Sequence, residues 1–89
     1  MPEERVITSD EADDSVAGLA RHLVAFEAEF AAHRPARVVL GDASDAALAA
    51  ALVATKMLIA LEATPAARDA SALNGRLIAQ LVPTYTEVA

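Results

Sequence analysis

The chain has 89 residues, a formal net charge of −6 at pH 7 and no cysteine. Alanine supplies 23 of the residues, and because alanine favours helices but buries little apolar area, the hydrophobic content of 55% overstates the core. The length suits one small domain over 1–89, the absence of cysteine excludes disulfide scaffolds and thiolate metal sites, and the acidic charge disfavours nucleic acid as a partner.

Neither a membrane span nor a secretory leader is predicted. The longest wholly apolar run, 46–54, covers nine residues, whereas a spanning helix needs about 18. Residues 1–5 are acidic and precede no long apolar run, unlike a signal peptide. We therefore expect no membrane partner and a cytoplasmic location, with which the absence of cysteine is compatible.

The first third of the chain predicts an extended lead-in and one long helix. The lead-in covers 1–8, of which 5–8 could be a short strand. The helix is predicted over 9–34, because residues 8–11 resemble a capping box with an acidic first turn. Apolar side chains then recur every three or four residues, at Val16, Leu19, Leu23, Phe26 and Phe30. Pro35 ends the helix, because the residue before a proline leaves the α region.

Residues 36–89 predict an alternation of strands and helices, βαβαβ. The expected elements are a strand at 37–40, a helix at 45–55, a strand at 57–61, a helix at 70–81 and a strand at 85–88. With the long helix in front, the order is α-β-α-β-α-β, which favours an α/β fold with a parallel sheet and right-handed crossovers. We expect a small three-layer sheet that forms half of a Rossmann-like domain.

Two acids follow the first two predicted strands. Asp42 comes after one strand through Gly41, and Glu62 comes directly after the next. Ligands of open parallel sheets bind beyond the carboxyl ends of the strands, so we expect both carboxylates at one rim. Two carboxylates whose pKa values are moved apart can act as an acid and a base. In the simpler alternative, Asp42 caps the following helix and Glu62 is a solvated loop residue.

Other candidate sites are less specific. The turn from Gly41 to Ser44 leads into a helix, whose amino end could hold an anion, but it lacks the further glycines and the lysine of nucleotide-binding loops. His22 and His33 lie eleven positions apart on the predicted helix, roughly 16 Å, and cannot share a metal ion within it. We predict no metal site and no cofactor.

Four segments together resemble a known family. They are Arg-Pro-Ala-Arg-Val-Val-Leu-Gly-Asp at 34–42, the Ala/Leu stretch at 46–53, Leu-Ile-Ala-Leu-Glu-Ala at 58–63 and Asn-Gly-Arg-Leu-Ile at 74–78. In this order they resemble part of the UDP-N-acetylglucosamine 2-epimerase family, namely the second half of its N-terminal Rossmann-like domain. Residues 15–34 are compatible with the helix that precedes the Gly-Asp strand in that family.

The resemblance implies a particular chemistry. Enzymes of this family hold a UDP-sugar between two Rossmann-like domains and use acidic residues to abstract the proton at C2 and to eliminate UDP. Asp42 matches the aspartate of Gly-Asp, and Glu62 matches the glutamate of Glu-Ala, so these two would be the catalytic acids. The ligand-binding candidates are Gly41, Ser44, Asn74 and Arg76.

The chain also departs from the family pattern. Thr-Pro-Ala at 64–66 replaces Gly-Leu-Arg, and Ala-Ser-Ala at 70–72 replaces Pro-Glu-Glu, which removes a further catalytic glutamate. Gly75 stands where the family has the arginine directly after the asparagine, so only Arg76 is matched. The first strands of the domain and the whole UDP-binding second domain lie outside this chain. One copy therefore cannot assemble a full epimerase site.

Three functional hypotheses follow. The first is a truncated, epimerase-like α/β domain that is not catalytic alone and acts as a self-associating or partner-binding module. The second is one half of a split UDP-sugar epimerase that contributes Asp42 and Glu62. The third is a binding protein for a nucleotide-sugar. We expect a homodimer, because the exposed edges of a three-stranded sheet can pair across a two-fold axis, although no edge or face is indicated.

Overall fold

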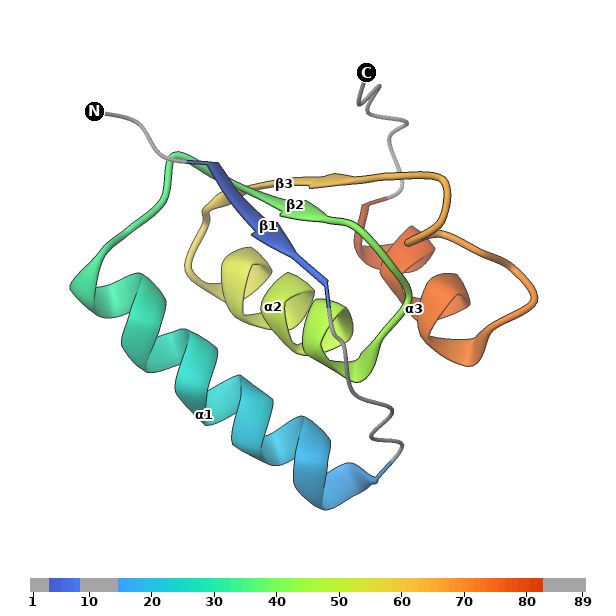
Figure 1. Ribbon diagram of the computed structural model, residues 1–89. Coiled ribbons are helices and arrows are strands. Elements are labelled where there is room, and N and C mark those ends of the chain that lie inside the picture. Colours follow the sequence, from blue (N-terminus) through green and yellow to red (C-terminus); the bar gives the residue numbers. More distant parts are fainter. Residues whose placement is uncertain (1–3, 9–14, 83–89) are drawn as a thin grey trace.

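Three parallel strands alternate with three helices in the computed structural model, which describes residues 4–8 and 15–82 (Figure 1). The elements are β1 (Glu4–Ile7), α1 (Val16–Ala32), β2 (Arg37–Leu40), α2 (Asp45–Lys56), β3 (Ala60–Ala63) and α3 (Leu73–Leu81). The predicted α/β class with a parallel sheet is confirmed, and the arrangement is consistent with half of a Rossmann-like domain.

One of the three strands, β1, lies near the start of the chain, ahead of the first helix. β1 pairs with β2, and Ile7, which is buried, stands in register with Leu40. The described elements therefore run β-α-β-α-β-α, so a strand precedes the helix with which the predicted order α-β-α-β-α-β begins. The short strand considered for 5–8 exists as β1, while the strand predicted for 85–88 lies outside the described residues.

The helices lie on one face of the sheet (Figure 1). The strand order is β1-β2-β3, so each successive connection moves in the same direction across the sheet. Right-handed crossovers that move in one direction place their helices on the same face. Over residues 4–8 and 15–82 the molecule thus has two layers, and the predicted three-layer arrangement is wrong there.

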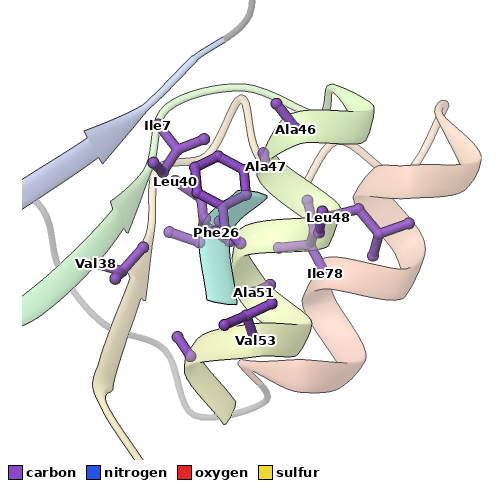
Figure 2. Packing of buried hydrophobic residues seen from close by; sticks show 14 of the residues in the cluster. Ile7, Phe26, Val38, Leu40, Ala46, Ala47, Leu48, Ala51, Val53 and Ile78 are labelled. Carbon is purple, nitrogen blue, oxygen red and sulfur yellow. The ribbon is translucent and has the colours of Figure 1, made fainter. Parts of the chain in front are cut away.

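The central helix α2 holds the core together. It contacts all three strands, and α1 and α3 pack on its flanks. Six of its alanines are buried, at positions 46, 47, 49, 50, 51 and 54. Small side chains let the helix approach the sheet closely, and Figure 2 shows Ala47 and Ala51 of α2 among the larger side chains of the same cluster, including Val38, Leu40 and Ile78.

The outer helices begin and end inside the predicted ranges. α1 starts at Val16 after Ser15, whose Oγ accepts a hydrogen bond from the N–H of Gly18 at 2.9 Å. It ends at Ala32 rather than at residue 34, and most of the capping box predicted at 8–11 lies outside the described residues. α3 begins at Leu73 rather than at residue 70.

The carboxyl end of α2 is a Schellman motif, in which N–H groups beyond the helix bond back to its last turn. The N–H of Ile59 donates to the carbonyl of Ala54 at 2.9 Å, and the N–H of Leu58 donates to that of Thr55 at 3.3 Å. Leu58 has a φ of 61°, the left-handed conformation that glycine usually provides at this position. The turn uses the start of the strand predicted at 57–61, so β3 begins later than expected.

Candidate functional site

The carboxyl ends of the strands form a rim beside the amino ends of α2 and α3 (Figure 1). At this rim the N–H of Gly41 donates to the carbonyl of Ile7 at 2.8 Å, which ties the end of β2 to β1. A Cβ atom on Gly41 would lie 2.5 Å from Cγ2 of Thr8. The close approach of the chain after β1 therefore accounts for the glycine without a ligand.

Asp42 and Ser44 both serve the start of α2. The Oγ of Ser44 accepts a hydrogen bond from the N–H of Ala47 at 3.0 Å, so Ser44 is the N-cap. Oδ1 of Asp42 accepts from the N–H of Ser44 at 3.2 Å. The simpler alternative made Asp42 the cap of this helix, whereas the structure gives that place to Ser44 and has Asp42 hold the N–H of Ser44.

A cavity of about 350 Å³ opens between the amino ends of α2 and α3. Nδ2 of Asn74 donates to Oδ1 of Asp45 at 2.7 Å and to the carbonyl of Ala43 at 3.3 Å. These three residues line the cavity together with Ala72 and Leu73. Asn74 therefore lies beside the turn between Gly41 and Ser44, although neither of these two residues lines the cavity.

Arg76 does not line this cavity. Its Nη1 donates to the carbonyl of Ala70 at 2.9 Å, so the guanidinium binds the loop before α3. The polar side chain that lies beside Asn74 in this cavity is instead Asp45, a residue that the sequence did not single out. Asp45 lies in the first turn of α2, where an acid suits the helix dipole. Its contact with Asn74 joins positions 29 apart, which no local pattern reveals.

Glu62 lies inside β3 and not after it. Its Oε2 accepts a hydrogen bond from Nη1 of Arg37 at 3.0 Å, and Nη2 of Arg37 donates to Oε1 of Glu4 at 2.9 Å. One guanidinium on β2 therefore joins acids on β1 and β3, across all three strands. The hydrogen bond to Glu4, and then the charges of Glu4 and Glu62, raise the pKa of Arg37 above its ordinary value.

These ion pairs occupy the sheet face opposite the helices. Side chains alternate along a strand, and the register places Glu4, Arg37 and Glu62 on the same face as Val39. Val39 is only 3% exposed, yet it stands outside the main core cluster, which contains Val38 and Leu40. The second face of the sheet therefore carries charged pairs with a small apolar centre.

The structure does not bring Asp42 and Glu62 together. The carboxylate of Glu62 reaches back to Arg37, the first residue of β2, whereas Asp42 lies beyond the last residue of that strand. The expectation of a shared rim depended on a strand that ended before Glu62, and the turn at Leu58 displaces β3 toward the carboxyl terminus. The assignment of both acids as catalytic residues stays a prediction.

A second hollow lies at the opposite end of α2, against α1. It measures about 210 Å³ and is lined by Leu23, Val24, Glu27, Val53, Lys56 and Met57. Val24 beside it is 69% exposed, and Leu58, which directly follows Met57, is 86% exposed. Nothing in the sequence patterns marked this region, because the exposed residues lie on a helix surface and in a turn.

Within residues 4–8 and 15–82 there is neither a cluster of metal ligands nor a membrane-spanning helix. His22 stacks on Phe26 with ring centroids 6.2 Å apart. Over residues 4–8 and 15–82, no three His, Asp or Glu side chains gather as a metal ion would require. None of the described helices has both the length and the apolar content needed to span a bilayer.

The chain was compared with protein-family models, with curated proteins and with solved structures, and none of them matches. The resemblance to the epimerase family therefore rests on the sequence segments at 34–42, 46–53, 58–63 and 74–78 alone.

Proposed function

We propose that this chain is a self-associating α/β module that performs no catalysis alone and resembles part of the UDP-N-acetylglucosamine 2-epimerase family. The observation that supports it best is the exposure of two large apolar side chains: Val24, which lines the hollow, and Leu58, which follows the lining residue Met57 in the chain. Exposed apolar side chains that border a hollow are typical of protein contacts, whereas isolated ones are ordinary. Association would remove this surface from water.

The engagement of the candidate acids favours the same conclusion. Glu62 is held by Arg37, and Asp42 supports the start of α2. A catalytic carboxylate needs access to its substrate, so the split-epimerase alternative requires Glu62 to leave its ion pair first.

Sedimentation equilibrium of the purified chain tests the proposal. We expect the mean mass to rise from that of one 9.2-kDa chain toward that of two as the concentration increases from low micromolar to near millimolar. A mass that stays at one chain over this whole range would contradict the proposal.

Nucleotide-sugar binding is a second candidate, and the cavity between α2 and α3 favours it. Asn74 is oriented there by Asp45 and Ala43, and the first turn of α3 has no capping side chain because its N-cap is Ala72. The Asp45 carboxylate can accept hydrogen bonds from sugar hydroxyls. Titration with UDP-N-acetylglucosamine, followed by amide NMR, should shift signals at 43–45 and 72–74, and unchanged signals at millimolar ligand would contradict this candidate.

A further inference from the structure

Leu58 combines a strained backbone with a side chain in solvent. Its φ of 61° lies in the left-handed region, where a β-carbon is disfavoured, and its side chain is 86% exposed. Glycine or asparagine would suit the turn better, and a side chain in water gains nothing from burial within its own chain. The leucine therefore has no evident benefit to the fold of a single copy.

The turn that carries Leu58 is held in place from two sides. The Schellman hydrogen bonds of Ile59 and Leu58 fix it to the last turn of α2. Nη2 of Arg34 donates to the carbonyls of Met57 at 2.9 Å and of Leu58 at 3.1 Å. The backbone of a turn fixed in this way loses little further conformational freedom when its side chain binds.

The hollow beside this turn has the size and chemistry to accept an apolar side chain. Its volume is about 210 Å³, and Leu23, Val24, Val53 and Met57 supply its apolar wall. Met57 lines the hollow, and Leu58 is its neighbour in the chain, so the protruding side chain and the hollow lie on adjoining surface.

The charges at the hollow are also self-complementary. Glu27 of α1 and Lys56 of α2 both line it. A second copy related by a two-fold axis presents the same two charges in reverse order, so that acid can face base in both directions. An unrelated partner would have to supply both the apolar insert and the matching charges.

We propose that Leu58 of one copy inserts into the hollow of a second copy, and that the reciprocal contact forms around a two-fold axis. This inference rests on the self-association proposed above and names its surface. Each copy contributes one protruding leucine and one hollow, which gives a closed dimer and no open filament.

The variant L58G separates association from folding. It removes the apolar side chain and also relieves the strained backbone, so we expect dimerisation to weaken by about tenfold or more while the folded chain is not destabilised. The matched control is V16N, because Val16 is also exposed but lies at the first position of α1 and lines neither the hollow nor the cavity with Asn74. The control should associate like the parent chain.

Cross-linking identifies the surface directly, because the natural chain has no cysteine. We expect an equal mixture of the single variants L58C and V24C to form covalent dimers under mild oxidation, faster than either variant alone. The charge variants E27K and K56E should each weaken association, and the double variant E27K/K56E should restore it.

The outcomes separate the two proposals. A parent chain that dimerises while L58G dimerises equally well, or while the cysteine mixture stays unlinked, overturns the Leu58 contact and leaves self-association standing. A parent chain that stays monomeric at near-millimolar concentration overturns both.

Discussion

Arg37 of β2 holds Glu62 of β3 through a hydrogen bond of 3.0 Å on the sheet face that the described helices leave open. The same guanidinium binds Glu4 of β1, so one side chain joins three parallel strands. Side-chain pairs across neighbouring strands contribute to the stability of a sheet. The acid with the best resemblance to a catalytic glutamate therefore has a structural partner.

Replacing Arg37 tests how much the three strands depend on it. We expect R37M to lower the free energy of unfolding modestly, since the ion pairs are partly exposed, and to lose most of this difference in concentrated salt. Urea denaturation at low and high ionic strength measures it. R37K keeps the charge but not the paired geometry, so its free energy of unfolding should lie between those of R37M and the natural chain. If the loss of unfolding free energy in R37M is as large in high salt as in low salt, the role of Arg37 is not electrostatic.

Leu58→Gly should make the monomeric chain more stable. The substitution removes the cost of a β-carbon in the left-handed conformation, and we expect a gain of about 1 kcal/mol. Thermal unfolding at concentrations below dimerisation measures the change. L58A retains the β-carbon and should give no such gain, so an equal gain in both variants would show that relief of backbone strain is not the cause.

Gly75→Ala should destabilise the chain although alanine is the better helix former. A Cβ atom at this position would collide with the backbone of Asp69, which cannot rotate away as the end of a side chain could. We expect a loss of about 2 kcal/mol, because the strain of overpacking exceeds the gain in helix propensity. Chemical denaturation measures it, and a stabilised variant would show that the loop before α3 yields easily.

Acid should weaken the loop before α3. The side-chain and backbone hydrogen bonds from Ser71 lower the pKa of Asp69 below its ordinary value of 3.8. A lowered pKa contributes stability above the ordinary value, and this contribution disappears as the pH falls through the folded-state pKa. Carboxyl NMR titration should show the pKa of Asp69 moving up toward its ordinary value in S71A. S44A, which removes a distant hydroxyl, should leave it where it is.

The alanines of α2 should resist enlargement. Ala50 is fully buried, so A50L would force apart the sheet and the flanking helices and cost about 2 kcal/mol. The control A28L adds the same side chain to an exposed position of α1 and should change stability by less than about 0.5 kcal/mol. Denaturation of the two variants under one condition provides the measurement, and similar losses would argue against tight packing around α2.

Much of the fold was accessible from local patterns. The β-branched residues of β2 and the alanine-rich helix after it predicted those two elements close to their observed bounds. Ser44, in the turn that leads into this helix, is its N-cap. These features depend on neighbours in the chain, so a sequence pattern contains the information that decides them.

The candidate site was less accessible, because it depends on register and on distant contacts. Leu58 was read as part of a strand, since nothing local shows that a leucine takes the place of glycine in a Schellman turn. That displacement moved Glu62 from the rim to the middle of the sheet face. The contact between Asn74 and Asp45 and the hollow between α1 and α2 both arise from packing of segments far apart in sequence.

The sheet and the two other helices surround α2, so its two ends are more accessible than its sides. Its flanks are occupied by the sheet, α1 and α3, so mainly the ends of this 12-residue rod reach the surface, roughly 18 Å apart. One end opens on the cavity with Asn74, at the positive pole of the helix dipole, and the other carries Lys56 and Leu58 at the negative pole. A nucleotide-sugar at the first end and a second copy at the other would therefore both contact this one helix.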